Sequence, residues 1–273
     1  MSGFAVDWLA LREPADRRAR SAAIVADVAH AMGFLSTQQQ VRVTDLGCGT
    51  GSTLRALSPH LPARQHWRLV DNDPALLGAA AQRARELPQS VTVAPLRADL
   101  QDELEAVVAL DADLLTASAF LDLVSHAWLE RLAAAAAQHR RPVYVALSYD
   151  GRTRCDPVDP FDAAVLASFN THQLGDKGLG GALGPTAAAA AVRCFEAVGF
   201  EVRTAPADWR LGSGDRALQE QLVLGWHRAA GETATLDPAA LDGWLGRRLA
   251  ALADGRSRLE VGHVDLWARP RRP

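Results

Sequence analysis

The sequence has few cysteines, no clustered histidines and no long apolar run. Its three cysteines, Cys48, Cys155 and Cys194, form no Cys-x-x-Cys pair, which argues against a disulfide framework and a structural zinc site. The eight histidines are scattered without a His-x-x-x-His pair, so we predict no metal. No apolar stretch reaches the ~18 residues of a membrane span, and residues 1–20 contain no signal-like apolar core. We therefore expect a cytoplasmic protein with no membrane partner.

A strong net charge is also lacking. The formal charge of the 273 residues is -3, so no basic field exists to attract nucleic acid, and we predict no nucleic-acid partner. The hydrophobic fraction of 48% is that of a globular chain with a core, and the length is that of one large domain. The expected partner is a small-molecule substrate, with a homodimer as a further possibility.

Short apolar runs alternate with helical patterns along most of the chain. We predict strands at residues 41–46, 66–71, 91–96, 113–117 and 142–148, and later at 200–209 and 259–268. We predict helices at residues 14–32, 52–58, 73–87, 101–109, 125–139, 186–198, 215–230 and 238–253. Alternation of this kind indicates βαβ units, and continuously apolar strands indicate helices on both faces of the sheet. The predicted fold class is therefore α/β, with a doubly wound, Rossmann-like, mostly parallel sheet.

We expect residues 1–273 to form a single domain with four parts. An N-terminal helical cap spans 1–40, with Pro14 in the first turn of its helix and Gly33 after the last. A cofactor-binding half spans 41–149 and a C-terminal half spans 185–273. Between them, residues 150–184 hold several prolines and glycines and show no long periodic element, which is typical of a lid inserted after the fifth strand.

A glycine-rich loop leaves the first predicted strand in the sequence Asp45-Leu-Gly47-Cys-Gly49-Thr-Gly51. Glycine allows the backbone to turn tightly and to approach a ligand without a Cβ in the way. A plain strand-to-helix turn would need fewer glycines. A dinucleotide fingerprint would read Gly-x-Gly-x-x-Gly, whereas here the third glycine comes one position early.

Carboxylates follow the next two strands. Asp71 ends the second strand, where α/β folds bind ribose hydroxyls, and Asp73 before Pro74 has the pattern of a helix N-cap. Asp99 ends the third strand and either meets an adenine amino group or caps the helix that follows. We assign Asp71 to the ribose and treat Asp73 as structural.

These motifs resemble those of the class I S-adenosylmethionine-dependent methyltransferases. The resemblance rests on Asp45–Gly51, Val70–Pro74 and Ala98–Leu100, spans about residues 41–148, and extends to the closing strands. It implies a seven-stranded sheet whose last strand is antiparallel, and S-adenosylmethionine as the cofactor. The resemblance further implies that Asp45, Gly47, Gly49 and Gly51 surround the methionine part of the cofactor. It places Asp71 at the ribose, and Asp99 and Leu100 at the adenine. Residues Thr116 to Phe120 would lie on the side facing the substrate.

Electrostatics separate the two candidate cofactors. The acidic Asp45 would repel the pyrophosphate of a nicotinamide or flavin dinucleotide, but it suits a sulfonium that carries an ammonium group. The implied activity is therefore methyl transfer to a small molecule at oxygen or nitrogen. A non-catalytic S-adenosylmethionine-binding regulator and an NAD(P)-dependent oxidoreductase are the alternatives.

Methyl transfer needs a general base only if the acceptor arrives protonated. Asp122 follows the fourth strand, Tyr149 follows the fifth, and His172 lies in the predicted lid, where a histidine that titrates near neutral pH is a candidate base. Each has a plainer interpretation, which for Asp122 is helix capping and for His172 a solvated surface loop. Arg12 either pairs with the cofactor carboxylate or forms a surface salt bridge. Cys48 is interpreted as a packing residue, and Trp226 and Trp244 as core residues or part of a dimer surface.

Overall fold

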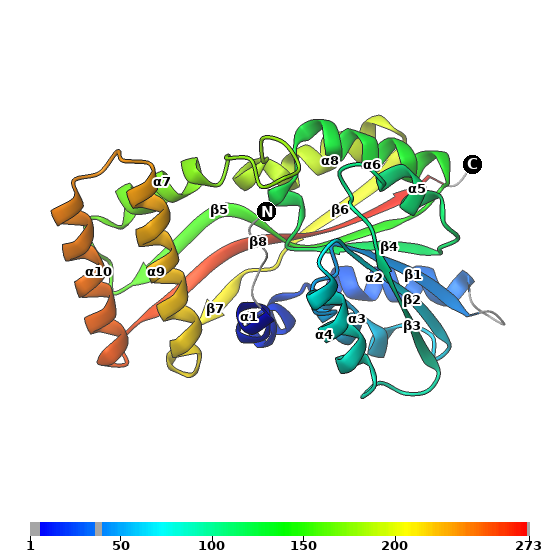
Figure 1. Cartoon of the computed structure of the whole chain (residues 1–273), viewed down its shortest axis with the longest axis horizontal. Coiled ribbons are helices and arrows are strands. Elements are labelled where there is room, and N and C mark those ends of the chain that lie inside the picture. Colours follow the sequence, from blue (N-terminus) through cyan, green and yellow to red (C-terminus); the bar gives the residue numbers. More distant parts are fainter. Residues whose placement is uncertain (1–5, 36–39, 272–273) are drawn as a thin grey trace.

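The computed structural model describes residues 6–35 and 40–271, so parts of the cap predicted over 1–40, and the last two residues, lie outside the described chain. One mixed sheet forms its centre, in the order β3-β2-β1-β4-β5-β8-β6, with β7 paired to β8 (Figure 1). The strands are β1 Val41–Leu46, β2 Gln65–Asp71, β3 Val91–Arg97, β4 Leu114–Ser118, β5 Val143–Asp156, β6 Phe200–Pro206, β7 Trp209–Leu211 and β8 Arg258–Pro270.

The first five strands are parallel, and β8 is antiparallel to both β5 and β6. The α/β fold with an antiparallel last strand is therefore confirmed. The prediction of seven strands misses one, because the strand expected over 200–209 divides into β6 and the short β7. Both of these pair with β8, at opposite ends of its length.

Helices cover both faces of the sheet (Figure 1). On one face α5 Leu104–Ala109, α6 His126–Gln138 and α8 Ala187–Ala197 enclose an apolar core that includes Trp128 and Phe195. On the other face α2 Ala22–Leu35, α3 Ser52–Leu57 and α4 Pro74–Ala84 enclose a second core around Trp67. Burial on both faces explains why the strands read as continuous apolar runs. None of the described helices combines the length and hydrophobicity needed to cross a lipid bilayer.

The N-terminal helical prediction is wrong in its boundaries. Two helices stand where one was predicted, α1 Val6–Ala19 and α2, and they are separated at Ser21. There the Ser21 backbone N–H donates to Asp265 Oδ2 (2.9 Å) instead of continuing a helix. Pro14 lies inside α1 and not in its first turn, and Gly33 lies inside α2 and does not end it.

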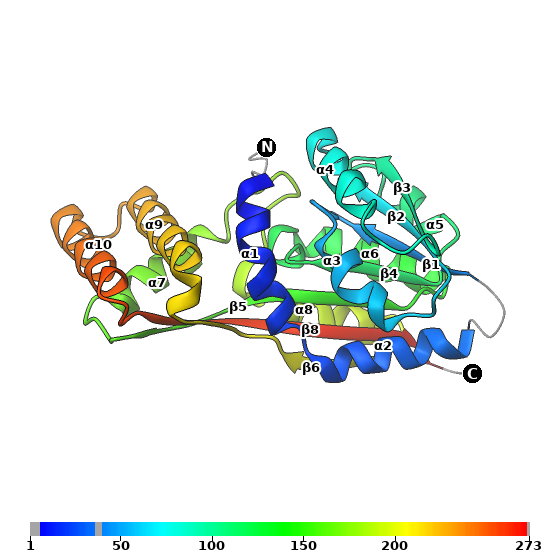
Figure 2. The same ribbon diagram turned by 90° about the horizontal axis from the view of Figure 1, so that it is seen from below.

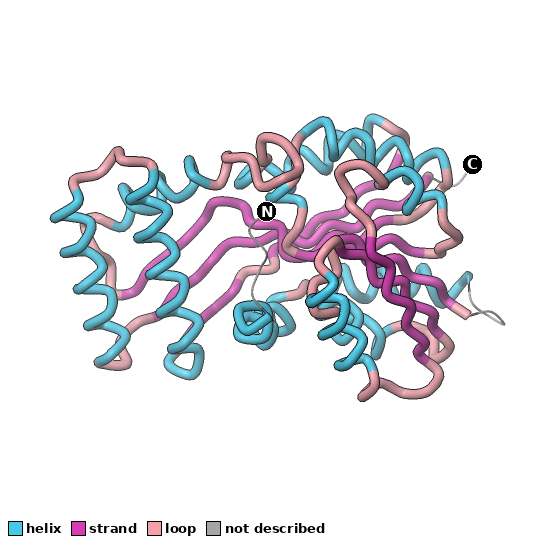
Figure 3. The backbone as a smooth tube through the Cα atoms, viewed as in Figure 1, coloured by secondary structure: helices cyan, strands magenta, loops and turns pink. Residues whose placement is uncertain are grey.

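Beyond the body of the molecule, β5, β8 and β7 extend into an arm, which is formed by residues 149–156, 209–211 and 258–263 of these strands with three helices (Figure 3). Helices α7 Asp162–His172, α9 Arg216–Glu232 and α10 Pro238–Ala253 lie on one side of its strands (Figure 2). The arm has its own apolar core, in which Trp226 and Trp244 are buried. Both tryptophans are thus core residues.

The prediction of an irregular segment over 150–184 is only partly right. Residues 150–156 continue β5 and residues 162–172 form α7, so no long loop follows the fifth strand there. Residues 157–161 and 173–183 run without a regular helix or strand, and the second stretch precedes the short 3-10 turn Gly184–Thr186. The reason is that β5 continues beside β8, which supplies backbone partners that a local sequence pattern does not reveal.

Candidate functional site

The glycine loop forms the floor of the site. Gly47 and Gly49 have φ of 62° and 53°, a left-handed conformation that glycine adopts without steric cost. A Cβ on Gly47 would lie 2.6 Å from the Phe120 ring, and a Cβ on Gly49 would lie 3.1 Å from Leu9. Both glycines are therefore required by the packing of neighbouring segments over the loop as well as by its backbone conformation.

Asp71 binds the same loop from the end of β2. Its Oδ2 accepts the Gly49 backbone N–H (2.9 Å), and its Oδ1 accepts the Asp73 N–H (3.0 Å). Each carboxylate oxygen retains a lone pair for a ligand hydroxyl. Asp73 caps α4 by accepting from the Ala75 N–H (2.8 Å), as predicted for a structural residue.

Asp45 lies beneath the loop and is almost completely buried. Its Oδ1 accepts a hydrogen bond from the Thr116 hydroxyl (2.7 Å), while its Oδ2 has no partner within the described chain. Burial raises the pKa of Asp45 to about 7, although Thr116 and the nearby Arg20 guanidinium lower it. A buried, unpartnered carboxylate oxygen is costly, and it is suited to a ligand that brings a positive charge.

A cavity opens above these residues, at the carboxyl ends of the parallel strands. Its walls come from the glycine loop, the ends of β2, β3 and β4, helix α1, and the loop after α7. The lining includes Gly47, Gly49, Asp71, Asp99, Leu100, Ser118, Ala119, Phe120, Leu9, Arg12, Asp16 and Lys177. Open α/β sheets bind ligands at this edge, and the sequence motifs of the first four strands do converge there. Asp99 lines the cavity, and its side chain accepts the Gln101 N–H in the turn before α5. The N-cap of α5 is Glu103, so the prediction that Asp99 caps this helix is wrong.

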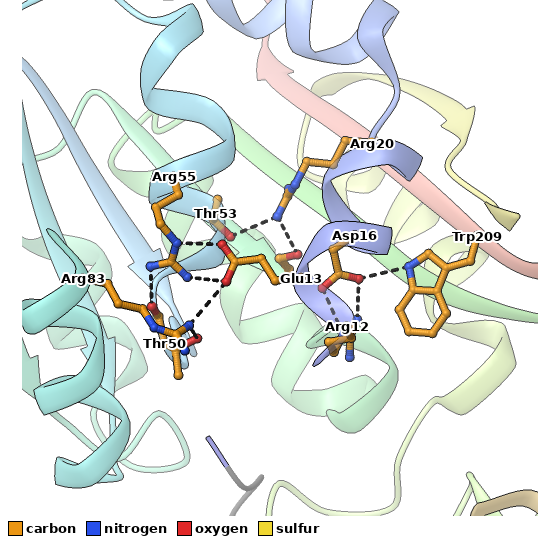
Figure 4. Close-up of polar contacts among 10 residues, drawn as sticks. Arg12, Glu13, Asp16, Arg20, Thr50, Thr53, Arg55, Arg83 and Trp209 are labelled. Atoms are coloured by element: carbon orange, nitrogen blue, oxygen red, sulfur yellow. Dashed lines mark hydrogen bonds and ion pairs between the residues drawn. The ribbon is translucent and has the colours of Figure 1, made fainter. Parts of the chain in front are cut away.

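Helix α1 covers the cavity and is fixed by charged contacts (Figure 4). Glu13 accepts two hydrogen bonds from Arg55 of α3 (2.7 Å each), and Arg83 of α4 lies 3.4 Å away. Both the Glu13 and the Arg55 side chains are only 13% exposed. Burial alone would raise the pKa of Glu13, but Arg55 and Arg83 hold it below its usual value. The carboxylate of Glu13 is therefore ionised and joins α1 to the two helices that flank the glycine loop.

Arg12 is not the surface salt bridge considered above. It lines the cavity, makes two hydrogen bonds to Asp16 (2.9 and 3.1 Å), and stacks over the Trp209 ring with its guanidinium carbon 5.0 Å from the centroid. Asp16 also accepts from the Trp209 indole N–H (3.0 Å; Figure 4). The pair thus connects the cavity to the arm.

Asp122 lies in the 3-10 turn Leu121–Leu123, between two residues that line the cavity. Its Oδ1 is shielded from solvent and has no partner among the described residues. Burial raises the pKa of Asp122 to about 6, even though a backbone N–H and Arg12 lower it. Ser125, and not Asp122, caps α6 by accepting from the Trp128 N–H. Asp122 therefore has the ionisation of a general base.

Tyr149 and His172 do not line the cavity. The Tyr149 hydroxyl donates to Asn170 Oδ1 (2.7 Å), and burial raises its pKa to about 12, so the phenol is neutral. His172 ends α7, and its Nε2 lies 2.8 Å from Glu232 Oε2 of α9. Asp122 does not line the cavity directly either, but it lies between the lining residues Phe120 and Leu123, which favours it over His172. Cys48 lines the cavity, and burial raises its pKa well above the usual value, so its thiol is protonated.

Several residues of the site carry no motif and were missed by sequence reasoning. Arg20 is half-buried and donates to the hydroxyls of Ser118 (3.1 Å) and Tyr144 (3.4 Å), and Tyr144 in turn donates to Asp265. Ser118 lines the cavity, so Arg20 fixes the hydroxyl at the end of β4. Only the positions of α1, β5 and β8 in the fold bring these groups together.

Comparison with known proteins identifies a family for the part of the chain that carries the glycine loop. Residues 43–143 match the family model described as a methyltransferase domain. These residues span β1 to the start of β5 and include the glycine loop, Asp71 and Asp99. Residues 43–143 thus carry a methyltransferase domain, whose cofactor is S-adenosylmethionine. Asp45 Oδ2, the glycine cradle and Asp71 fit the ammonium, the methionine chain and the ribose of that cofactor.

No curated protein matches the sequence. Among solved structures, a cyclopropane synthase from Mycobacterium tuberculosis is similar, at 13% identity and a TM-score of 0.47, over 89% of this chain and 83% of that one. The YcgJ protein from Bacillus subtilis is similar at 14% identity and a TM-score of 0.46, over 89% of this chain and 99% of that one.

Proposed function

We propose that the methyl acceptor is a small molecule methylated at oxygen or nitrogen, and that Asp122 removes its proton. The observation that supports the proposal is the unpartnered, shielded Oδ1 of Asp122, which lies next to cavity-lining Phe120 and Leu123. A carboxylate with a pKa of about 6 is ionised at neutral pH and is basic enough to accept a proton from a bound acceptor. The bound cofactor supplies the electrophilic methyl group.

The remaining work of the protein is positioning and exclusion of water. Helix α1 and the loop at residues 177–179 both contribute to the cavity wall, although they are far apart in the sequence. We accordingly interpret them as parts of a cap and a lid around one domain. Tyr149 has no catalytic role in this proposal, because it does not line the cavity and its hydroxyl already donates to Asn170.

Release of S-adenosylhomocysteine in the presence of a panel of phenols, carboxylic acids and amines tests the proposal. At least one acceptor should give turnover, with mass spectrometry locating the added methyl on oxygen or nitrogen. Methylation only at carbon, or only of protein or nucleic acid, would contradict it.

Asp45 gives the affinity for S-adenosylhomocysteine a pH dependence. Its raised pKa of about 7 leaves it largely protonated below that pH, whereas an ammonium ligand requires the carboxylate. Affinity should therefore rise with pH up to about 7, by up to ~tenfold per unit, since one pKa unit corresponds to about 1.4 kcal/mol. Calorimetric titrations between about pH 5.5 and 8.5 measure this. In Asp45→Asn, affinity should be lower and the slope absent, and an unchanged slope would assign the titration to another group.

Glu13→Gln should speed the release of S-adenosylhomocysteine. The substitution keeps the shape of the side chain but removes the charge that binds Arg55 and Arg83. Hydrogen bonds to charged groups contribute about 1.5–3 kcal/mol, so we expect release to be about 10-fold faster in stopped-flow measurements. Arg17→Gln is the matched control, because Arg17 is exposed and lies 3.7 Å from the same carboxylate. Equal effects of both variants would show that α1 does not retain the ligand.

A further inference from the structure

Lys177 is the only lysine among the 29 lysine and arginine residues of the sequence. It lies in the loop between α7 and α8, is half-buried, and lines the cavity. Within residues 6–35 and 40–271 it has no hydrogen-bond or ion-pair partner. An ammonium group at the wall of a cavity, without an anionic partner in the protein, is available to pair with a negatively charged ligand.

The loop that carries Lys177 is fixed to the far side of the cavity from the ribose site. The Ser125 N–H donates to the Leu179 carbonyl (3.1 Å), and the Leu183 N–H donates to the Val124 carbonyl (2.8 Å). Residues 124 and 125 follow β4, which lies beside β1 on the side away from β2 and β3. Lys177 therefore approaches over the β4 end of the sheet, while Asp71 and Asp99 follow β2 and β3.

The acidic and basic side chains of the cavity wall also lie on different sides of the cavity. Asp71, Asp73 and Asp99 form an acidic wall on the side of β2 and β3. Arg12, the other cation of the lining, is already bonded to Asp16 through two nitrogen atoms. Lys177 is thus the cation of the wall that is left to meet a negatively charged group.

We propose that Lys177 binds the anionic group, a carboxylate or a phosphate, of the methyl acceptor. This inference rests on the proposed methyl transfer to a small molecule, and it narrows the class of acceptors to those that carry an acidic group. Lysine acts here as a point charge on a flexible stem, so it accommodates either anion.

A protein with a single lysine allows this group to be observed directly. Lysine labelled with 13C and 15N gives one set of side-chain NMR signals, which is followed in the protein saturated with S-adenosylhomocysteine during separate titrations with acetate and inorganic phosphate. The variant Arg193→Lys adds a reference lysine on the exposed surface of α8. We expect the Lys177 signals to shift and saturate at millimolar anion while the reference signals change only with ionic strength. A response to acetate alone assigns the carboxylate, and a response to phosphate alone assigns the phosphate.

Two results would overturn the inference. Lys177 signals that follow the reference lysine would show no anion site. The second result concerns binding of the cofactor carboxylate by Lys177. In that case Lys177→Met would lower the affinity for S-adenosylhomocysteine at least 10-fold. The affinity for 5′-methylthioadenosine, which has no carboxylate, would be unchanged. The inference requires both affinities to stay within about twofold. Methyl transfer to neutral acceptors alone would also contradict it, yet it would leave the proposed small-molecule methylation intact.

Discussion

Turnover by Asp122→Asn should fall by ~100-fold or more, with little change in the affinity for S-adenosylhomocysteine. General-base catalysis contributes about 10²–10⁴ to a rate, and the amide has the size of the carboxylate but cannot accept the proton. In the unaltered protein kcat/KM should rise with pH to a plateau, with its inflection near pH 6, because burial raises the pKa of Asp122 to about 6 and the ionised form is the active one. The variant should lack that inflection. Steady-state rates with the acceptor found in the panel, taken from about pH 5 to 9, measure both effects.

His172→Gln is the control for Asp122. It removes a titratable group that lies outside the cavity and contacts Glu232, so turnover should be nearly unchanged, with at most a small loss of stability. If His172→Gln loses turnover and Asp122→Asn does not, the base is histidine and the local geometry of α7 changes on binding. If neither variant loses turnover, the acceptor arrives deprotonated and no base is needed.

Asp71→Ala should weaken the binding of S-adenosylhomocysteine by ~100-fold or more. The substitution removes two possible hydrogen bonds to the ribose, each involving a charged acceptor and contributing about 1.5–3 kcal/mol. It also leaves the Gly49 N–H without its partner, so the glycine loop loses part of its support. Isothermal titration of the purified variant gives the loss directly, and its thermal midpoint shows whether the fold is retained.

Asp73→Ala separates a lost ligand contact from a lost helix cap. Asp73 also lines the cavity, but its side chain caps α4 through the Ala75 N–H. We expect this variant to lose about 1 kcal/mol of stability, with the affinity for S-adenosylhomocysteine changed less than threefold (roughly the effect of 0.6 kcal/mol). A larger loss of affinity in Asp73→Ala than in Asp71→Ala would move the ribose contact to Asp73.

The cofactor half of the fold could be predicted closely because its signals are local. Strand β1 has the predicted bounds, and the glycine loop, Asp71 and the Asp73 N-cap all depend on residues a few positions apart. The arm could not be predicted in this way. From Tyr149 to Asp156 the strand alternates buried and exposed residues and includes Gly151, so its apolar run ends at Ser148 although its pairing with β8 continues.

The candidate catalytic residues show the same limit. His172 was chosen for its titration range, but its position is set by α7 packing on α9, far along the chain. The contacts of Glu13 with Arg55 and Arg83 join residues 42 and 70 positions apart, and no local pattern marks them. The single lysine can be found in the sequence, but its inferred role in anion binding depends on a cavity that only the folded chain forms.

The unbroken run of β5 and β8 through body and arm has a consequence for how the chain can be shortened. The residues that support the arm helices and those that underlie the cavity belong to the same two strands, which remain hydrogen-bonded to each other along most of their length. Deleting the arm would therefore cut both strands beside Tyr149 and His263. The remaining body would not be an intact catalytic module. Domain shuffling at this junction should therefore disrupt the pairing of β5 with β8 in the body as well as in the arm.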